Sequence, residues 1–396
     1  MKSNRFTRGA VVTSAIAQTS GGQMKTAIPR STVDTHLASN RTIGRIEPVF
    51  EFHGAMPTGV TVSSSGRIFI SFPRWGDNVP FTVGEIRGNK VVAYPDQAIN
   101  DFDPSRPSET LSNVQSVVVE PSNRLWILDT GAPKFAPPFP GYAKMLASDL
   151  ATNKVVKTIV FSSTTVTPTT YVNDIRFDLR QGKEGFAYLT DSTSTGPGGI
   201  IVVDLDSGEN WRRLTGHPST SPDPSFIPLV EGERFALREK GKPPIAFNTC
   251  SDGIAISADG LKLYYCPLSS RHLFSISTEL LRDRSADDAA VAKSIVDLGE
   301  KGASDGLESD DKGRVYAGDY ENNSIRQLQT NGEWQTIAHD PRILWPDTLS
   351  VASKGYLYFT ANQLHHQPQF NEGIDRREKP YVLFRMKIDA GPVLLK

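Results

Sequence analysis

The chain has 396 residues, with 43 basic and 44 acidic side chains and a formal net charge of −1. Because phosphate groups and anionic lipids are bound by clustered positive charge, this balance gives no support for a nucleic-acid partner or an electrostatic membrane contact. No run approaches the roughly 20 apolar residues of a membrane span, and an apolar content of 38% allows a large core. We expect a folded monomer.

Residues 1–44 are polar and form the first predicted region, an N-terminal tail. Three basic residues precede a short apolar stretch, and Ala15-Ile16-Ala17 has the A-x-A form of a signal-peptide cleavage site. Thr13 and Ser14 interrupt the apolar stretch. Two interpretations therefore stay open: an exported protein, secreted or periplasmic, or a cytoplasmic protein with a disordered tail.

One sequence pattern recurs six times after the tail. Each copy has a small polar entry, an apolar alternation, a tight turn and a second apolar stretch, which predicts a β-hairpin. Hairpins repeated along a chain in this way indicate an array or a propeller. The six copies are 56–71, 114–129, 172–191, 250–267, 303–319 and 346–360.

A further strand pair follows each of the first five copies, with hairpin turns such as Thr-Asn-Gly between the two strands. After the fourth copy a helix-like segment separates 272–277 from 294–299. Six units of four antiparallel strands predict an all-β fold, a six-bladed β-propeller spanning 45–396. The strand at 45–52 precedes the first copy. We expect it to close the last blade by pairing with 381–395, since closure removes exposed sheet edges.

The predicted strand order sorts the connections between two ends of the propeller. The tight hairpin turns lie at one end, which we call the plain end, and the long connections lie at the other, the loop face. Long loops gathered on one face of a rigid scaffold are where binding is expected. These connections are 72–81, 95–113, 130–143, 217–249 and 361–380.

A polar residue stands at the start of the first strand in every copy. Because these strands line the propeller axis, their side chains should meet at the opening of the central tunnel. We call this set the ring. The ring residues are Thr58, Gln115, Asn173, Asp252, Asp305 and Asp347, with Asp174 beside Asn173.

Several carboxylates in one small space repel each other unless a proton or a cation relieves the repulsion. An oxygen-only set of ligands suits Ca²⁺, whereas Zn²⁺ prefers clustered His or Cys. The predicted metal ligands are Asn173, Asp252, Asp305 and Asp347. The alternative is that Asp-Gly and Asn-Asp are ordinary turn residues that bind backbone N–H groups, and both interpretations stay open.

The loop face adds aromatic and histidine side chains above this polar floor, which is the usual make-up of a small-molecule site. Among them, His365 next to His366 is the best candidate for proton transfer, with an exposed solvated pair as the alternative. The candidate catalytic residues are Asp252, Asp305 and His365. The candidate ligand-binding residues are Thr58, Gln115, Asp174, Trp75, Phe135 and Tyr320.

Two further features have alternative interpretations. A second polar set ends the second strand of four copies, and it either supports the ring or caps loops. Its members are Asp129, Asp191, Asp319 and Asn362. Cys250 and Cys266 fall nearly opposite each other on one hairpin, so they form either a disulfide or two buried free thiols, depending on a one-residue register difference.

The sequence also resembles a known family. The string FPRWGDNVPFTV within 56–86 is the most specific piece, and LWILDTG, YVNDIRFD, AYLTDS and YYCPLSSRHLFSI agree with it. These segments are similar to the yellow / major royal jelly protein family, including its microbial members, over about 45–388. The resemblance implies a six-bladed propeller, usually secreted. In insect members it implies binding of aromatic amines at the tunnel mouth or a link to dopachrome conversion, and microbial members are often described as gluconolactonase-like.

A more distant resemblance is to calcium-dependent lactonase propellers, whose metal lies in the axis on Glu, Asn and Asp. It implies that Asn173 and Asp252, with Asp305 or Asp347, are ligands, while Thr58 stands where a Glu would be expected. Two functions follow as hypotheses. One is metal-assisted hydrolysis of a lactone or ester, and the other is binding or tautomerisation of an aromatic amine or catechol.

Overall fold

The computed structural model describes residues 41–396. The proposed cleavage site and nearly all of the predicted tail lie outside the described residues, so the interpretations of the N-terminus stay predictions. Within the described part, no helix is long and apolar enough to cross a membrane.

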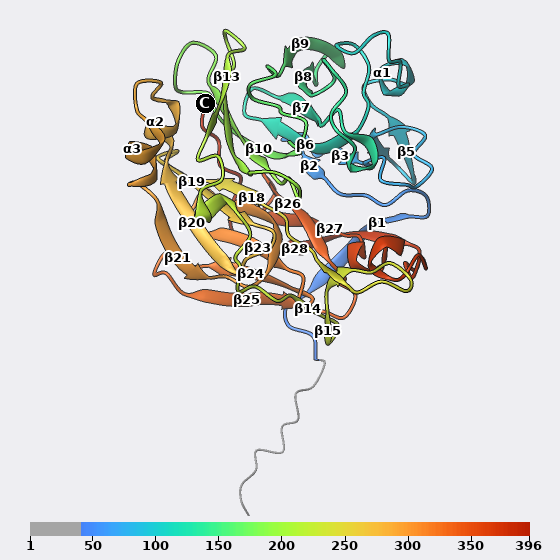
Figure 1. Cartoon of the computed structure of the whole chain (residues 1–396). Coiled ribbons are helices and arrows are strands. Elements are labelled where there is room, and N and C mark those ends of the chain that lie inside the picture. The colour runs from blue at the N-terminus through green and yellow to red at the C-terminus, as the bar shows by residue number, and fades with distance from the viewer. Residues whose placement is uncertain (1–40) are drawn as a thin grey trace, which may run out of the picture. The chain divides into compact units, whose positions relative to one another are not determined.

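Six four-stranded antiparallel sheets make up this part of the chain, as the hairpin repeat predicts (Figure 1). Each innermost strand contacts the innermost strands of both neighbouring blades, so the ring of blades is closed. The all-β six-bladed propeller is confirmed. The innermost strands are β2 (Val60–Val62), β6 (Val114–Glu120), β10 (Val172–Asp178), β18 (Ser251–Ile256), β22 (Ser304–Ser309) and β26 (Pro346–Ala352).

The outer strands follow in sequence within the first five blades. They are β3 (Ile68–Ser71), β4 (Val83–Arg87) and β5 (Lys90–Ala93); β7 (Arg124–Asp129), β8 (Lys144–Asp149) and β9 (Lys154–Val160); β11 (Phe186–Asp191), β12 (Gly199–Asp204) and β13 (Asn210–Arg213); β19 (Lys262–Pro267), β20 (His272–Ser277) and β21 (Val296–Glu300); and β23 (Val315–Asp319), β24 (Ser324–Leu328) and β25 (Trp334–His339).

The sixth blade has the order β26-β27-β28-β1, with β27 (Tyr356–Ala361), β28 (Tyr381–Lys387) and β1 (Ile46–Phe52). Strand β1 runs antiparallel to β28, with Phe52 opposite Tyr381 and Glu47 opposite Arg385. Strand β28 ends at Lys387, where the chain leaves the sheet, so it is shorter than the predicted 381–395. Residues 388–396 instead cross the plain end, where Leu179 N donates to Leu395 O at 2.9 Å and Asp311 N donates to Gly391 O at 3.0 Å.

The connections between strands contain short helices, 3₁₀ turns and two-stranded ribbons. The helices are α1 (Gln97–Asn100), α2 (Thr278–Arg282) and α3 (Asp288–Ala292), and the 3₁₀ turns are η1 (Pro133–Phe135), η2 (Pro218–Thr220), η3 (Leu364–His366) and η4 (Pro368–Phe370). Two small ribbons lie in the 217–249 connection, β14 (Leu229–Val230) with β15 (Glu233–Arg234) and β16 (Ala236–Leu237) with β17 (Ile245–Ala246).

The apolar core is divided among the interfaces between blades. One cluster joins Trp126 of β7 to Ile175 of β10, and another joins Tyr188 of β11 to Ile254 of β18. Comparable clusters lie between the other neighbouring pairs. Burial of apolar area is the main favourable term in folding, so the blades stabilise one another. A separate aromatic cluster lies beneath the loop face.

The innermost strands are irregular where the ring residues stand. In five of the six blades the register shifts there, for example between Ser304 and Leu307. Such a bulge bends the strand and changes the direction in which its side chains point. Gly306 follows Asp305 at this point, and a Cβ on it would collide with Asp347 O of the next blade. These Asp-Gly pairs are therefore strand residues at a close approach, and the turn interpretation is wrong for them.

Both cysteines are free and buried. The bulge between Ser251 and Ile254 shifts the register of the hairpin, so Cys250 and Cys266 are not paired across it. The buried-thiol alternative holds, and the disulfide is absent from this hairpin.

Candidate functional site

Three ring carboxylates and one amide converge at the loop-face end of the axis. The Asn173 amide contacts the Asp252 carboxyl group, and the carboxyl groups of Asp252 and Asp305 lie close enough to shift each other's pKa. Asp347 lies close enough for its charge to act on Asp252. We call these four residues the acidic cluster. Its three aspartates are only 3–7% exposed.

Burial gives the acidic cluster unusual proton affinity. It raises the pKa of Asp252 and Asp347 well above the usual range, and the Asp305 charge adds to the effect on both. Burial raises the pKa of Asp305 to about 6. Each carboxylate is therefore costly to ionise while the others are charged.

The acidic cluster differs from most other buried aspartates of residues 41–396 in lacking a basic partner. Asp319 also forms no ion pair there, but it stands alone and accepts from Asn322 Nδ2 at 2.9 Å. The carboxylates of Asp129, Asp174 and Asp191 each form an ion pair, with Lys144 at 2.9 Å, Arg176 at 2.9 Å and Arg212 at 2.8 Å, respectively. Among residues 41–396, no Lys, Arg or His nitrogen lies within 4.0 Å of Asp252, Asp305 or Asp347. Buried charges are normally paired or bind metals, so this oxygen-only set fits a hard cation such as Ca²⁺.

Two side chains outside the ring hold the carboxylates in place. Trp345 Nε1 donates to Asp305 Oδ2 at 2.7 Å, and Asn362 Nδ2 donates to Asp347 Oδ2 at 2.6 Å. Trp345 has a φ of 58°, which is uncommon for a bulky residue. Its ring stacks on Tyr320 with centroids 4.2 Å apart. The strained backbone therefore places the indole N–H where it meets Asp305.

Asp174 lies beside the acidic cluster but has partners of its own. Its carboxylate accepts from Ser116 Oγ at 2.7 Å and from Arg176 Nη1 at 2.9 Å. Arg176 also donates to Leu307 O at 2.7 Å, which ties the third blade to the fifth across the axis. Asp174 is thus neutralised within the channel, and its predicted ligand-binding role stays a prediction.

The Gln115 side of the ring leads outward to aromatic residues. Tyr171 OH donates to Gln115 Oε1 at 3.1 Å and accepts from Trp75 Nε1 at 2.8 Å. Phe135 stacks on Trp75 at 5.0 Å between centroids and is 57% exposed. Thr58, in contrast, is fully buried and bonds to Gln115 O at 3.3 Å. Phe135 is therefore accessible on the loop face and Thr58 is not, and the ligand-binding roles of Thr58, Trp75 and Phe135 stay predictions.

Tyr320 belongs to an aromatic cap above the acidic cluster. It is 1% exposed, and its hydroxyl donates to Leu268 O at 2.9 Å. The cap consists of Phe235, Tyr320, Trp345 and Phe370. Tyr320 therefore supports Trp345 and does not line a described cavity.

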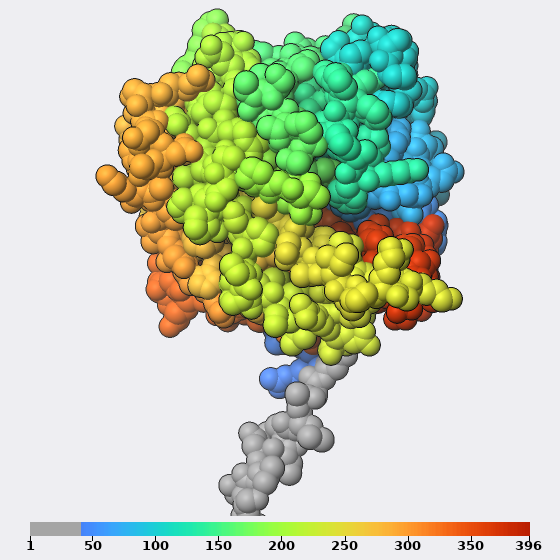
Figure 2. Space-filling view, in the orientation of Figure 1, coloured from blue at the N-terminus to red at the C-terminus, as the bar shows by residue number. Residues whose placement is uncertain are grey.

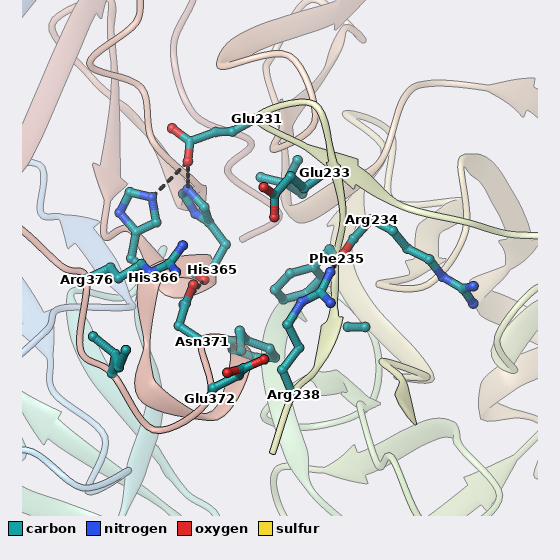
Figure 3. Close-up of a pocket in the computed structure, with 14 residues that line it drawn as sticks. Glu231, Glu233, Arg234, Phe235, Arg238, His365, His366, Asn371, Glu372 and Arg376 are labelled. Atoms are coloured by element: carbon teal, nitrogen blue, oxygen red, sulfur yellow. Dashed lines mark hydrogen bonds and ion pairs between the residues drawn. The ribbon is translucent and has the colours of Figure 1, made fainter. Parts of the chain in front are cut away.

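His365 lies on the far side of this cap. Its ring packs against Trp345 with centroids 5.9 Å apart, so the three predicted catalytic residues are not in mutual contact. Its neighbours are His366 and Glu231, whose Oε2 is 3.2 Å from His365 Nε2 and 2.8 Å from His366 Nε2 (Figure 3). The facing imidazoles lower the pKa of Glu231 to about 2, and burial lowers the pKa of His365.

Two of the cavities in the described part of the chain are lined by the long 217–249 and 361–380 connections. One of about 340 Å³ is lined by Glu231, Phe235, Arg238, His365 and His366, among others. A second of about 810 Å³ is lined by residues that include Trp75, Asp77, Leu237, Arg238 and Gln369. None of the four residues of the acidic cluster lines either cavity.

The second polar set of the sequence divides between the two predicted roles. Asp129, Asp191 and Asp319 accept from backbone N–H groups of the adjoining loops, for example Gly131 N at 3.0 Å and Glu321 N at 3.2 Å. They cap loops. Asn362 instead binds Asp347 and supports the acidic cluster.

The sequence profile of the family described as "Major royal jelly protein" matches residues 112–391, well over half of the chain. The chain belongs to the major royal jelly protein family. Its curated relatives include Protein yellow of Drosophila erecta, 27% identical over 262 residues, and Protein yellow of Drosophila melanogaster, 26% identical over the same length. Each match covers 63% of this chain and 46% of the relative, so the chain spans less than half of these relatives.

Solved structures similar to this family member share its fold at low sequence identity. A luciferin-regenerating enzyme has a TM-score of 0.54 at 12% identity, covering 89% of this chain and 99% of its own. A gluconolactonase from Xanthomonas campestris has a TM-score of 0.50 at 13% identity, covering 87% and 89%. At these identities the similarity concerns the fold alone.

Several residues of the candidate site were not predicted from the sequence. Tyr171 and Trp345 each stand two positions before a ring residue, so the repeat alignment held a signal for them. Asn113, at the equivalent position of the second repeat, donates to Tyr171 OH at 3.2 Å. Glu231 had no such signal, because it lies in an irregular connection outside the repeats.

Proposed function

We propose that this chain acts on a small molecule at the loop face as a metal-assisted lactone or ester hydrolase. The observation that supports this is a buried set of three carboxylates and an amide without a basic partner. Asn173, Asp252, Asp305 and Asp347 would hold a Ca²⁺ ion there. When bound, such an ion supplies Lewis-acid polarisation of the substrate carbonyl.

The chain's own residues supply the proton chemistry in this proposal. Asp252 and Asp305 lie next to each other in the acidic cluster, and a carboxylate oxygen that is not bound to the ion is placed to act as a general base. One member accepts a proton from water, and the leaving alkoxide receives one in return. Trp345 fixes the orientation of Asp305, and Asn362 that of Asp347.

The aromatic cap bears on substrate access. Trp345 contacts Asp305 and stacks on Tyr320, so a substrate that approaches Asp305 from this side requires their displacement. The same fold occurs in the Xanthomonas gluconolactonase, which makes sugar lactones the first substrate class to test.

Calorimetric titration with Ca²⁺ after chelation tests the metal. We expect one site per chain and a rise in melting temperature, since a ligand that binds only the folded state stabilises it by mass action. Asp305→Asn should reduce Ca²⁺ affinity at least tenfold. Asp259→Asn, at the plain end on the fourth-blade hairpin, should leave it unchanged.

Hydrolysis is tested with a lactone and ester panel under a pH-indicator readout. Activity should appear with Ca²⁺ and be lost in Asp252→Asn and Asp305→Asn. Absence of both binding and thermal stabilisation by Ca²⁺ would rule out the metal-assisted mechanism.

A second candidate function is binding or tautomerisation of an aromatic amine or catechol. The observation that favours it is the exposed Phe135, which stacks on Trp75 beside the larger cavity. Asp77 lines the same cavity and provides a negative charge for an ammonium group, while the rings provide a stacking surface.

A thermal-shift screen of amines, catechols and lactones separates the two candidates. Stabilisation by amines that is lost in Phe135→Ala, with no response to Ca²⁺, would favour the second. Phe102→Ala removes an exposed aromatic that lines neither loop-face cavity, and it serves as the control.

A further inference from the structure

A hairpin on the loop face presents Glu231 to two adjacent histidines. Strands β14 and β15 are joined by Glu231 and Gly232, which have φ values of 51° and 81°. Two central residues with positive φ are typical of a type I′ hairpin. Asn or Gly usually occupies the first position, so a glutamate there is unusual. Its backbone directs the carboxylate away from the hairpin and toward η3 (Figure 3).

The histidines are held from the other side. Gln363, which precedes η3, exchanges two hydrogen bonds with the Glu378 backbone, at 2.6 and 2.8 Å. Asn371 Nδ2 donates to His365 O at 2.9 Å. The two imidazole rings lie with centroids 4.0 Å apart. These hydrogen bonds position the two histidines from within the 361–380 connection itself.

The ring nitrogens of these histidines are incompletely bonded. His365 is 7% exposed, and neither of its ring nitrogens has a hydrogen-bond partner within the described residues. Its Nε2 is 3.2 Å from Glu231 Oε2, but the angle does not meet hydrogen-bond geometry. His366 Nδ1 also lacks a partner there. A buried polar atom without a hydrogen bond is unfavourable. A buried imidazole whose one polar neighbour here is the Glu231 carboxylate is therefore suited to bind a further ligand.

We propose that Glu231, His365 and His366 form a binding site for a divalent transition-metal ion, with Zn²⁺ as the first candidate. One ligand atom from each residue lies within 4.8 Å of the other two. Zinc bonds of about 2.0–2.2 Å to His nitrogen and carboxylate oxygen require ligand atoms roughly 3–3.5 Å apart, and the observed separations of 2.8 and 3.2 Å are close to this.

Three protein ligands leave at least one coordination position open, which is the arrangement of catalytic zinc centres. All three residues line the 340 Å³ cavity, where Arg238 and Arg376 are also present. Their guanidinium groups suit a carboxylate or phosphate group, so the exogenous ligand we expect is a small organic anion.

This metal would also join two distant segments. Glu231 and His366 are 135 residues apart in sequence, and Figure 2 shows the yellow-green to yellow 230–247 region lying against the red segment near residue 370. The ligands share no residue with the acidic cluster, so the two sites are separable by mutation.

The test is calorimetric titration of the full-length, untagged and chelator-treated protein with Zn²⁺. Cobalt(II) absorption then serves as a direct readout of coordination by nitrogen and oxygen. We expect one Zn²⁺ per chain. His365→Ala and Glu231→Gln should each weaken Zn²⁺ binding at least tenfold. Loss of a group that only supports a metal ligand already lowers metal affinity by about this much. His53→Ala, at an exposed histidine that lines a different cavity, should have no effect.

Circular dichroism of each variant shows whether it remains folded, and Glu231→Gln keeps the size of the side chain in case His365→Ala does not fold. Asp305→Asn should leave Zn²⁺ binding intact, and Glu231→Gln should leave Ca²⁺ binding intact, so either site can fail alone. Zn²⁺ binding of equal strength in wild type, Glu231→Gln and His366→Ala would overturn the proposal, as would no binding at all.

Discussion

Trp345 shows how one residue determines the electrostatics of the candidate site. Its indole N–H is the one uncharged donor described for Asp305 outside the ring, and its ring separates the acidic cluster from His365. Hydrogen bonding to the ionised carboxyl group lowers its pKa, and burial raises it. Trp345 therefore keeps the pKa of Asp305 lower than burial alone would make it.

Trp345→Phe tests this role. The variant keeps an aromatic ring but removes the donor, so we expect a loss of about 1–3 kcal/mol in the free energy of unfolding from the unpaired carboxyl oxygen. Ca²⁺ affinity should change as well. Urea denaturation measures the first effect, and calorimetry the second.

Trp126→Phe is the matched control, because Trp126 is equally buried and its Nε1 has no partner among the described residues. A loss of stability no larger in Trp345→Phe than in this control would show that the hydrogen bond to Asp305 contributes nothing measurable.

At the scale of the element, the innermost strands combine a bulge with a close approach between blades. Gly253 faces Asp305 O, and Gly306 faces Asp347 O, so each glycine lets the next blade bring its carboxylate to the axis. The acidic cluster thus depends on the packing of strands β18, β22 and β26 as much as on the aspartates themselves.

Gly306→Ala is expected to destabilise the propeller by about 1–3 kcal/mol, the usual cost of overpacking, and to weaken Ca²⁺ binding by displacing Asp347. Thermal unfolding with and without Ca²⁺ measures both. Gly54→Ala provides the comparison, because a Cβ at Gly54 has no atom within 4 Å. Equal melting temperatures for the two variants would contradict the close-approach argument.

For the propeller of residues 41–396, the uncompensated acidic cluster predicts an unusual pH dependence. The pKa values of Asp252, Asp305 and Asp347 are raised by folding, so the folded state binds more protons than the unfolded state above the ordinary Asp pKa. Stability from these groups is present below pH 4 and is lost as pH rises through about 6 for Asp305 and higher for the others.

Metal-free protein should therefore lose about 1–3 kcal/mol of stability between pH 5 and pH 8, as measured by urea denaturation in chelator. Saturating Ca²⁺ should reduce this loss, and Asp305→Asn should have a smaller slope than wild type. If the stability of the metal-free protein rises over this range, folding does not raise the pKa values of these carboxyl groups.

Much of the fold was predictable because its signals are local. Alternating apolar residues and tight turns determine hairpins, and six such hairpins in one chain determine the blade number. The ring positions Asn173, Asp252, Asp305 and Asp347 followed from the same alignment, since equivalent positions in a closed ring face one axis. Trp345 and Tyr171 each stand two positions before a ring residue, but their residue types alone do not indicate which side chains they meet.

The sequence by itself determined the blades, the polar ring and the division into a plain end and a loop face, because each depends on residues near one another in the chain. Only the tertiary structure decided which charges have partners: Asp174 meets Arg176, whereas Asp252, Asp305 and Asp347 meet one another. It also decided that Glu231 reaches His365 and His366 across 135 residues. Such contacts depend on how irregular connections pack, and no periodic pattern in the chain encodes that packing.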